Sequence, residues 1–272
     1  MRPRFASSYG PWAIVAGGSE GLGAAFATQI ARRGVHMVLV ARRPEPLEQT
    51  ADHVRREHGV EVITVAADLG APGAVDQIVT AAAGVEIGLV VANAAFVPRG
   101  RFLDTAAADL AATVEVNCKS SMLLARTFLP GMAGRGRGGL ILMSSLVGMQ
   151  GVPGLAAYSA TKAYLISLGE SLWAELRPSG VDVLTVCAGA VSTPGYQQAT
   201  RRQAPGTTSP ELVAAIALRS LGHGFRVVPG TLNRVSTFAL NRLAPRKTAI
   251  AIFGRATAAA LKEPGIPQHH RC

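Results

Sequence analysis

Short runs of apolar residues alternate along most of the chain with longer stretches in which apolar positions recur at helical spacing. The apolar runs cover residues 12–16, 36–41, 61–66, 88–92, 139–144 and 181–186. Continuous runs of this length are typical of strands buried on both faces, and their alternation with helices predicts a parallel sheet covered on both sides. We therefore expect an α/β fold with a doubly wound, Rossmann-like sheet.

The chain gives no sign of a division into two domains. It has 272 residues, of which 49% are hydrophobic, and no Gly/Ser/Pro-rich linker or internal repeat interrupts the pattern. A helix is predicted over 209–221 and a short strand over 226–228. We expect one catalytic domain over residues 1–263, with a helical substrate lid and C-terminal extension over about 194–263, and a flexible tail over 264–272.

The first apolar run leads into a glycine-rich turn, Ala16–Gly23, and then into a helix-forming stretch, Ala24–Arg33, which Gly34 stops. A helix N-terminus presents free N–H groups and the positive end of the helix dipole, and glycine lets the backbone approach a ligand closely. The spacing is Gly-x-x-x-Gly-x-Gly, which differs from the commoner dinucleotide fingerprint. This unit predicts a dinucleotide phosphate site; a glycine-rich turn without a ligand is the alternative.

The end of the second apolar run carries Arg42 and Arg43 and no acidic residue. In a doubly wound sheet this strand end lies beside the adenosine ribose, where a carboxylate would accept hydrogen bonds from the 2′-hydroxyl and arginine accommodates a 2′-phosphate. The two arginines favour NADP(H) over NAD(H). They could instead be solvated loop charges, and Glu20 in the glycine turn counts against a 2′-phosphate.

Tyr158 and Lys162 lie four residues apart in a helical stretch, with Ser145 thirteen residues upstream. Residues at this spacing share one helix face, and a nearby ammonium favours the phenolate, so we expect Lys162 to lower the pKa of Tyr158. A tyrosine tuned in this way can serve as a general acid and base. A solvated surface pair is the alternative for these two residues alone.

Taken in order, these motifs resemble the short-chain dehydrogenase/reductase family over roughly Trp12 to Thr193. The resemblance implies a catalytic tetrad of Asn117, Ser145, Tyr158 and Lys162. It implies cofactor contacts from Gly17, Ser19, Glu20, Gly21, Leu22, Gly23, Arg42, Arg43, Asp68, Leu69, Asn93, Ala94, Lys162, Ala188, Gly189, Val191 and Thr193. The chain departs from the family pattern at Ala16, Ala92, Ala95 and Ala188, which replace Thr, Asn, Gly and Pro; none of these is a reacting group.

The family's activity is hydride transfer between a nicotinamide cofactor and a carbonyl or alcohol. The resemblance implies that Tyr158 transfers the proton, Ser145 stabilises the developing oxyanion, and Lys162 holds the nicotinamide ribose. It also implies that Asn117 bends its helix and anchors a water linking Lys162 to solvent. Ketoacyl-type reductases of the family share the Ala-Arg-Arg sequence after the second strand, which points to a bulky hydrophobic substrate. The expected pocket residues are Phe96, Val97, Met149, Val152, Pro153, Tyr196 and Gln197.

Two other functional classes remain open. A nucleotide-sugar epimerase or dehydratase shares the Tyr-x-x-x-Lys chemistry, although the short C-terminal region and the glycine spacing count against it. A non-catalytic cofactor-binding protein with a regulatory role is the other, and the complete tetrad speaks against it. No metal-ligand spacing accompanies Cys118, Cys187 and Cys272, so we expect no metal.

The formal net charge is +10 and is distributed unevenly. From Tyr196 onward the chain has eleven Lys/Arg residues and only two acidic residues, Glu211 and Glu263. We hypothesise that this basic, partly apolar region receives a hydrophobic substrate from an acidic carrier or at an anionic membrane surface. The alternative is compositional bias, since only four of the twenty-seven basic residues are lysines. No recognised motif or aromatic platform for nucleic acid accompanies the charge.

The apolar stretches near 106–133 and 157–177 exceed what one sheet face can cover, and in relatives the corresponding helices form a subunit interface. We therefore expect a homodimer or homotetramer. No apolar run approaches the ~18 residues that a membrane span requires, and no secretory signal precedes Trp12. We expect a cytoplasmic protein, with peripheral membrane contact as the second possibility.

Overall fold

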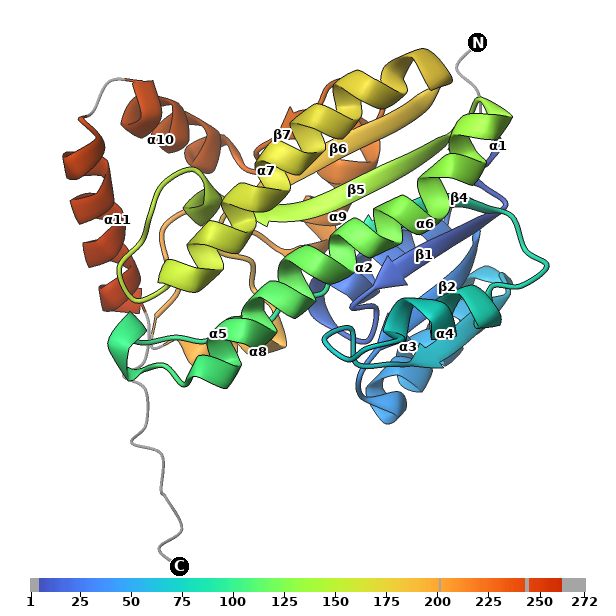
Figure 1. The fold of residues 1–272 in the computed structure, drawn as a ribbon, viewed down its shortest axis with the longest axis horizontal. Coiled ribbons are helices and arrows are strands. Elements are labelled where there is room, and N and C mark those ends of the chain that lie inside the picture. Colours follow the sequence, from blue (N-terminus) through green and yellow to red (C-terminus); the bar gives the residue numbers. More distant parts are fainter. Residues whose placement is uncertain (1–4, 201, 243–244, 261–272) are drawn as a thin grey trace, which may run out of the picture.

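The computed structural model describes residues 5–200, 202–242 and 245–260. Within them, parallel strands form one sheet in the order β3-β2-β1-β4-β5-β6-β7 (Figure 1). The strands are β1 (Trp12–Ala16), β2 (His36–Ala41), β3 (Val62–Ala66), β4 (Ile87–Ala92), β5 (Gly138–Ser145), β6 (Val181–Ala188) and β7 (Arg226–Val227). The predicted doubly wound fold is confirmed. The strand order reverses between β1 and β4, and ligands of such sheets bind at the carboxyl ends of the strands near this point.

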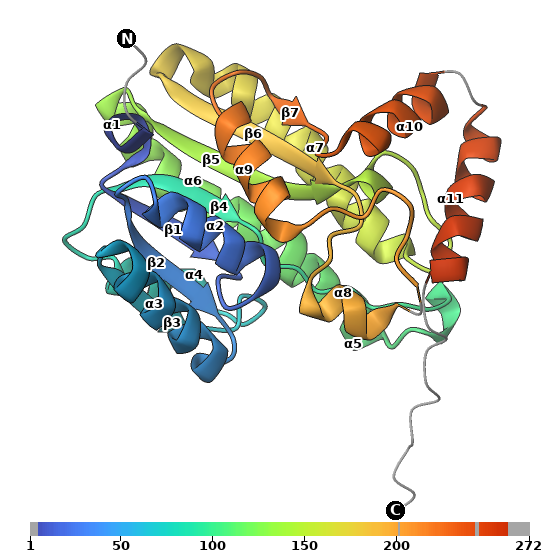
Figure 2. The ribbon, with the colours of Figure 1, turned by 180° about the vertical axis from the view of Figure 1, so that it is seen from behind.

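Alternate residues of β1 point into two separate cores, one on each face of the sheet. Ala13 and Val15 belong to one core and Ile14 to the other. The first core is covered by α2 (Gly21–Ala31), α3 (Pro44–His58) and α9 (Pro210–Ser220), and the second by α4 (Ala74–Ala81), α6 (Ser120–Arg135) and α7 (Ala156–Leu176). Helices α6 and α7 cross the near face in Figure 1, and α2 and α9 cross the opposite face in Figure 2. Burial on both faces explains why the strands read as unbroken apolar runs.

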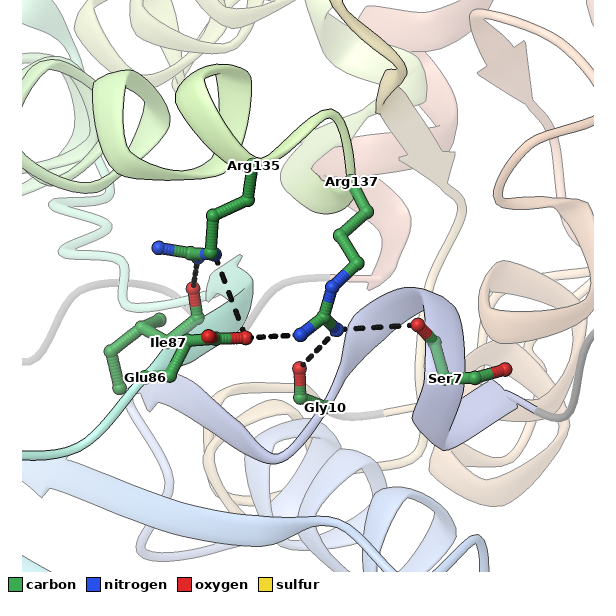
Figure 3. Close-up of polar contacts among 6 residues, drawn as sticks. All are labelled: Ser7, Gly10, Glu86, Ile87, Arg135 and Arg137. Atoms are coloured by element: carbon green, nitrogen blue, oxygen red, sulfur yellow. Dashed lines mark hydrogen bonds and ion pairs between the residues drawn. The ribbon is translucent and has the colours of Figure 1, made fainter.

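Two arginines hold the segments at the amino-terminal ends of the strands (Figure 3). Arg135 is the last residue of α6, and Arg137 lies just after it. Arg137 donates hydrogen bonds to the carbonyl oxygens of Ser7 and Gly10, at 3.2 and 3.1 Å, and also bonds the carboxylate of Glu86. Arg135 donates to the carbonyl oxygen of Ile87 at 2.7 Å. These contacts fasten the short helix α1 (Phe5–Tyr9) to the sheet, at the edge opposite the glycine turn.

Several predicted boundaries shift by a few residues. Helix α2 begins at Gly21 rather than Ala24 and ends at Ala31 rather than Arg33. The early start is possible because Gly21 has a positive φ of 55°, which lets the turn pass directly into the helix. The helix predicted over 209–221 matches α9, with Ser209 accepting a hydrogen bond from the Leu212 N–H at its N-terminus.

The apolar stretch near 106–133 forms two helices joined by a π-helical turn. Helix α5 (Ala107–Val114) passes into the π-turn Glu115–Lys119, which leads into α6. Single π-turns are rare and are often found at functional sites. Short 3-10 turns occur at Phe102–Asp104, Leu146–Gly148 and Arg177–Ser179.

The C-terminal region forms α8 (Pro194–Ala199), α10 (Thr231–Arg242) and α11 (Arg246–Ala260). Helices α10 and α11 lie at one end of the molecule in both ribbon views (Figures 1 and 2). Phe253 of α11 packs in a small apolar cluster with Met149, and a Cβ built on Gly254 would lie 3.2 Å from Pro153. Helix α11 therefore covers the loop that precedes α7. The tail predicted from Pro264 lies outside the described residues.

Candidate active site

The glycine turn between β1 and α2 adopts a conformation that side chains would block. Gly17 has φ +79°, and the N–H groups of Gly17 and Gly18 both donate to the carbonyl oxygen of Val40, at 2.7 and 3.0 Å. A Cβ built on Gly23 would lie 1.8 Å from the carbonyl oxygen of Gly17. The glycine at position 23 therefore lets α2 pack directly on its own turn.

The glycine turn also contacts two other segments at the carboxyl edge of the sheet. A Cβ on Gly17 would lie 2.8 Å from Ala94 Cα, and the Asn93 Nδ2 donates to the Gly17 carbonyl at 3.0 Å. A Cβ on Gly21 would lie 3.0 Å from Cβ of Thr193. The turn after β1, the end of β4 and the stretch after β6 thus converge around α2.

This arrangement fits a dinucleotide pyrophosphate. Glu20 precedes α2 in an extended conformation and makes no side-chain hydrogen bond to the first turn of the helix. The first-turn N–H groups are therefore left without a side-chain cap, at the positive end of the helix dipole and beside backbone that carries no Cβ at Gly21 and Gly23. The residues present there fit a phosphate, because free N–H groups and the positive end of the helix dipole both favour an anion.

The two arginines after β2 differ in their partners. Arg43 forms an ion pair of 2.9 Å with Glu20, across the mouth of the glycine turn. Arg42 is exposed and forms no ion pair with a residue that the structure describes. Sequence alone did not predict that Glu20 would engage one arginine and leave the other.

The remaining predicted cofactor residues lie at the same edge of the sheet. Asp68 follows β3 and accepts a hydrogen bond from the Gly70 N–H at 2.9 Å, while Leu69 is buried in the core. The Ser19 carbonyl accepts a hydrogen bond from the Thr50 hydroxyl at 2.7 Å. Leu22 packs against the core beneath α2.

The stretch after β6 is tied to the C-terminal helices through Asn233 of α10. Ala188 ends β6, Val191 pairs with Thr208, and Thr193 caps α8 by accepting from the Tyr196 N–H at 3.2 Å. A Cβ on Gly189 would lie 2.6 Å from the Asn233 Nδ2, which donates to the carbonyls of Gly206 and Pro229. Only a glycine at 189 leaves room for this amide.

The structure brings three of the four tetrad residues together beside this edge. Ser145 ends β5, and Tyr158 and Lys162 lie on the first two turns of α7. The Ser145 hydroxyl hydrogen bonds Tyr158, and the Lys162 ammonium lies 5.4 Å from the centre of the Tyr158 ring. The hydroxyl of Ser144, buried next to Ser145, donates to the Lys162 carbonyl at 2.7 Å and anchors α7 to the strand.

The lowered pKa that the spacing predicted for Tyr158 is not what the structure gives. Burial raises the pKa of Tyr158 to about 12, and the groups that oppose this rise are the Ser145 hydrogen bond and the charge of Arg99. Burial also lowers the pKa of Lys162 to about 8. Its ammonium donates to the Met143 carbonyl at 2.7 Å, and desolvation is the largest influence on the pKa of both side chains.

Asn117 lies within the π-turn and is fully buried. Its Oδ1 accepts from the Phe96 N–H at 2.7 Å, and its Nδ2 donates to the Phe96 carbonyl and to the Thr161 hydroxyl, both at 3.0 Å. The side chain thereby joins the loop after β4 to α7, one residue before Lys162. It holds both elements in place while the π-turn interrupts the regular helix.

Arg99 is a charged residue near Tyr158 that sequence reasoning missed. It lies in the loop between β4 and α5, and its guanidinium lowers the pKa of the Tyr158 phenol. No motif contains this residue, and its sequence distance from Tyr158 gives no hint of this electrostatic effect. Only the course of the loop in the folded chain reveals it.

The predicted pocket residues are spread around the same region. Phe96 is partly buried and held by Asn117, while Met149 and Pro153 lie beneath α11. Val152 is buried, and the Tyr196 hydroxyl accepts a hydrogen bond from the Ala204 N–H at 3.0 Å. The sequence prediction also includes Val97, which is partly buried, and Gln197, whose amide donates to Ser192 at 3.0 Å.

In residues 5–200, 202–242 and 245–260, no cluster of His, Cys, Asp and Glu is arranged to hold a metal ion. Within the same ranges, no helix combines the length and apolarity that a bilayer span requires.

The sheet order and the glycine turn define an α/β protein of the nicotinamide-dinucleotide-binding type. A sequence model described as short chain dehydrogenase matches residues 11–204. The chain belongs to this family, whose members are oxidoreductases that act on hydroxyl and carbonyl groups.

Similar proteins place the chain within the family more closely. It is 31% identical over 238 residues to a 7beta-hydroxysteroid dehydrogenase of Collinsella aerofaciens, covering 84% of this chain and 89% of that protein. A solved 7beta-hydroxysteroid dehydrogenase structure superposes with a TM-score of 0.86 at 28% identity, covering 92% of this chain and 99% of the other. A short-chain dehydrogenase of Sphingobium yanoikuyae in complex with NADPH gives a TM-score of 0.74 at 27% identity, with 96% and 98% covered.

Proposed function

We propose that the protein is an NADP(H)-dependent oxidoreductase that interconverts a carbonyl and a secondary alcohol on a hydrophobic substrate, with Tyr158 as general acid and base. The observation that carries the proposal is the convergence of Ser145, Tyr158 and Lys162 beside the glycine turn at one edge of the sheet. When bound, the nicotinamide supplies or accepts the hydride.

The chain's own residues manage the proton. The Tyr158 hydroxyl, whose pKa lies at about 12, is protonated at neutral pH and is ready to donate to a carbonyl oxygen that gains negative charge. Ser145 hydrogen bonds the same phenol and can share the developing charge on that oxygen. In the oxidation direction Tyr158 must first lose its proton, which a positive charge beside it makes easier.

Lys162 would hold a ribose hydroxyl of the cofactor, and its positive charge would favour the phenolate of Tyr158. Its pKa of about 8 keeps a substantial fraction of the ammonium charged at neutral pH. Asn117 acts through position, since it fixes the loop after β4 against α7. Both Nδ2 hydrogens of Asn117 are used in its bonds to Phe96 and Thr161, so the side chain has only an Oδ1 lone pair left for the expected water.

The preference for NADP(H) is supported by Arg42. Its guanidinium follows β2 at the adenosine side of the site and has no carboxylate partner among the described residues, so it can pair with a 2′-phosphate. No acidic residue stands at the end of β2 to accept bonds from a free ribose 2′-hydroxyl. The NADPH complex of a family member agrees with this choice.

The proposal of a hydrophobic substrate is supported by the apolar side chains with which α11 packs on the loop before α7. Met149, Phe253 and Val228 pack together around Leu146, close to the end of β5. The similarity to a hydroxysteroid dehydrogenase agrees with an apolar substrate.

The test is a fluorescence titration with NADPH and NADH, followed by reduction of ketones of graded chain length by wild type and by Tyr158→Phe. We expect tighter binding of NADPH, turnover that rises with chain length, and a loss of turnover of at least about a hundredfold in Tyr158→Phe with cofactor binding kept. Ketone reduction that survives the loss of the hydroxyl would contradict the role of Tyr158. Absence of turnover with retained cofactor binding favours the regulatory alternative, and conversion of a nucleotide sugar favours the epimerase.

We further propose that α10 contacts an anionic membrane surface. Leu232, Val235 and Phe238 recur at helical spacing and are 57%, 60% and 63% exposed, so this helix turns its apolar side chains toward solvent. No acidic residue occurs between Leu212 and Ala260, and Arg234 and Arg242 flank the apolar positions. An exposed apolar stripe between arginines fits lipid better than a water-soluble acidic carrier.

Flotation with vesicles of neutral lipid, and of neutral lipid with phosphatidylglycerol, tests the membrane contact. We expect binding only to the anionic vesicles, and loss of binding in Val235→Ser/Phe238→Ser. Equal recovery with both vesicle types contradicts the proposal, and co-elution with an acyl carrier protein instead would favour the carrier.

We also propose that the chain forms a homodimer or homotetramer through α6 and α7. A groove of about 500 Å³ between these helices is lined mainly by apolar side chains, including Met122, Leu129, Leu168 and Leu172. A second copy of the same two helices would cover these side chains. Sedimentation of wild type and of Leu172→Glu tests this face, with a shift to monomer expected in the variant.

A further inference from the structure

The side chain of Asn233 on α10 is enclosed by glycines from three separate segments. It is only 5% exposed. A Cβ built on Gly189 would lie 2.6 Å from its Nδ2, one on Gly230 would lie 3.1 Å from the same atom, and one on Gly206 would clash with its Oδ1. Gly206 and Gly230 also have a positive φ, whereas Gly189 does not. At position 189 the amide, and not the backbone conformation, therefore excludes a side chain.

The same amide holds the segment that pairs with the stretch after β6. Its Nδ2 donates to the Gly206 carbonyl at 3.0 Å. Two residues further on, the Thr208 N–H donates to the Ala190 carbonyl, and the Ser192 N–H donates to the Thr208 carbonyl, both at 2.9 Å. Asn233 thus contacts the beginning of the stretch after β6 directly and its middle through this paired segment.

The stretch Gly189–Thr193 runs between the two parts of the candidate site. Ala188, directly before it, pairs with Ser145 in the sheet. At the other end of the stretch, a Cβ built on Gly21 would lie 3.0 Å from the Cβ of Thr193. A dinucleotide with its phosphates at the glycine turn and its nicotinamide at Ser145 would pass along this stretch.

The next residue on the inner face of α10 has different surroundings. Thr237, one turn after Asn233, is 8% exposed, and its hydroxyl has no hydrogen-bond partner among the described residues. A buried polar side chain on this face of the helix therefore does not by itself produce the enclosure found at Asn233. The three glycines and the hydrogen bond to Gly206 are specific to the amide.

We propose that Asn233 is a positioning residue for the nicotinamide half of the cofactor, and that it acts by setting the course of Gly189–Thr193 from α10. The inference rests on the proposed function, from which it takes the cofactor. The adenosine half is expected at the glycine turn and the arginines after β2, and in the strand order β2 is separated from β6 by β1, β4 and β5. Loss of the amide should therefore weaken the binding of one half of the cofactor and not of the other.

The test compares the Kd of NADPH with the Kd of 2′-phospho-ADP-ribose, which carries the adenosine half and no nicotinamide. Both are measured by calorimetry for wild type, Asn233→Ala, Asn233→Asp, Gly189→Ala and Thr237→Val, with the melting temperature of each protein without ligand. Thr237→Val changes a buried polar side chain on the same face of α10 and serves as the matched control. A protein that is only less stable loses affinity for both ligands in the same proportion, so the ratio of the two Kd values isolates positioning.

In both Asn233 variants we expect the Kd of NADPH to rise about tenfold relative to that of 2′-phospho-ADP-ribose, as for the loss of one or two hydrogen bonds to the nicotinamide half. Gly189→Ala should raise the ratio as well, because its Cβ displaces the amide. In the Asn233→Ala background the same glycine substitution should add little, since no amide remains to be displaced. The ratio should stay unchanged in Thr237→Val.

An unchanged ratio in the Asn233 variants, or an equal rise in Thr237→Val, overturns the inference. A full additional effect of Gly189→Ala in the Asn233→Ala background also overturns it, because position 189 would then act without the amide. If neither Asn233 variant folds, the ratio in Gly189→Ala decides alone, and an unchanged value overturns the inference.

The outcomes also separate the inference from the function on which it rests. Wild type that binds neither ligand overturns the proposed cofactor, and the inference with it. Wild type that binds NADPH and reduces no ketone overturns the proposed reaction alone, because the two Kd values still test the role of Asn233.

Discussion

The ammonium of Lys162 donates a hydrogen bond to the carbonyl oxygen of Met143 at 2.7 Å, within a side chain that is only 2% exposed. The strand end thus holds this cation in the interior, where water no longer solvates it. One neutral carbonyl does not replace the water that would solvate this charge, and the pKa of Lys162 is lowered for this reason. We regard the buried ammonium as a cost in stability that serves cofactor binding.

Replacement of Lys162 by methionine should therefore stabilise the protein while reducing its activity. The pKa falls from 10.5 to about 8 on folding, so the charged side chain disfavours the folded state at pH 7. Allowing for the hydrogen bond lost at Met143, we expect the free energy of unfolding to rise by about 2 kcal/mol in Lys162→Met. Urea unfolding at pH 7 measures the difference.

The pH dependence identifies the cause of this gain. Between pH 8 and 10.5 the folded wild type has released the Lys162 proton and the unfolded chain has not, so this group makes wild type more stable as the pH rises. The advantage of Lys162→Met should shrink as the pH rises from 8 toward 10. Lys119→Met, which removes an exposed ion pair with Glu115, should change stability by less than about 0.5 kcal/mol. A constant gap across this pH range would show that packing, not charge, explains the result.

Replacement of Asn117 by alanine should destabilise the protein more than a neighbouring polar deletion. The substitution removes three hydrogen bonds and leaves both backbone groups of Phe96 without partners in the interior, for which we expect a loss of about 3 kcal/mol. Ser121→Ala, one turn away, removes one buried bond to the Asn117 carbonyl and should lose about 1 kcal/mol. Thermal and urea unfolding compare the two, and equal losses would contradict the bridging role of Asn117.

The fold and the glycine turn could be predicted because their signals are local. A strand buried on both faces can be recognised from five or six consecutive apolar residues, and the glycine turn from the eight residues Ala16–Gly23. The structure explains both glycines, since a Cβ at position 23 would clash with the Gly17 carbonyl and a Cβ at position 21 would crowd Thr193. Such contacts repeat wherever this turn occurs, so a spacing pattern is enough to recognise them.

The features that sequence reasoning missed depend on distant contacts or on burial. The effect of Arg99 on the pKa of Tyr158 depends on a loop that a backbone bond between Gly100 and Gly154 sets against the start of α7, which no periodicity encodes. The effect of Lys162 on Tyr158 was expected from their spacing, but desolvation decides both pKa values and spacing gives no measure of it. The π-turn at Glu115–Lys119 likewise contains Asn117, whose bonds to Phe96 and Thr161 join segments far apart in the sequence.

Replacement of Gly23 by alanine should weaken cofactor binding. The built Cβ lies 1.8 Å from the Gly17 carbonyl oxygen, so the glycine turn or α2 must move away from the phosphate position. We expect the Kd for NADPH to rise at least about tenfold, with a loss of stability of about 1–3 kcal/mol from overpacking. Fluorescence titration and urea unfolding measure the two effects.

Gly134 of α6 provides the matched control for this substitution. A Cβ at that position has nothing within 4 Å, and the glycine lies in regular helix. Gly134→Ala should therefore stabilise the protein by about 0.5–1 kcal/mol through helix propensity and leave the Kd for NADPH unchanged. If Gly23→Ala bound NADPH as wild type does, the glycine turn would not be the phosphate site.

The ion pair between Glu20 and Arg43 should weaken NADPH binding in the wild type. Glu20 engages Arg43 at 2.9 Å and places a negative charge beside the expected 2′-phosphate. In Glu20→Gln we expect the Kd for NADPH to fall by about threefold to tenfold and the Kd for NADH to change less, because only NADPH carries the extra phosphate.

Arg43→Ala should have a larger effect in the Glu20→Gln background than in wild type, and Arg42→Ala should weaken NADPH binding in both. These differences should shrink at high ionic strength, since both charges are exposed. Weaker NADPH binding in Glu20→Gln would mean that the carboxylate positions Arg43 for the phosphate and does not compete with it.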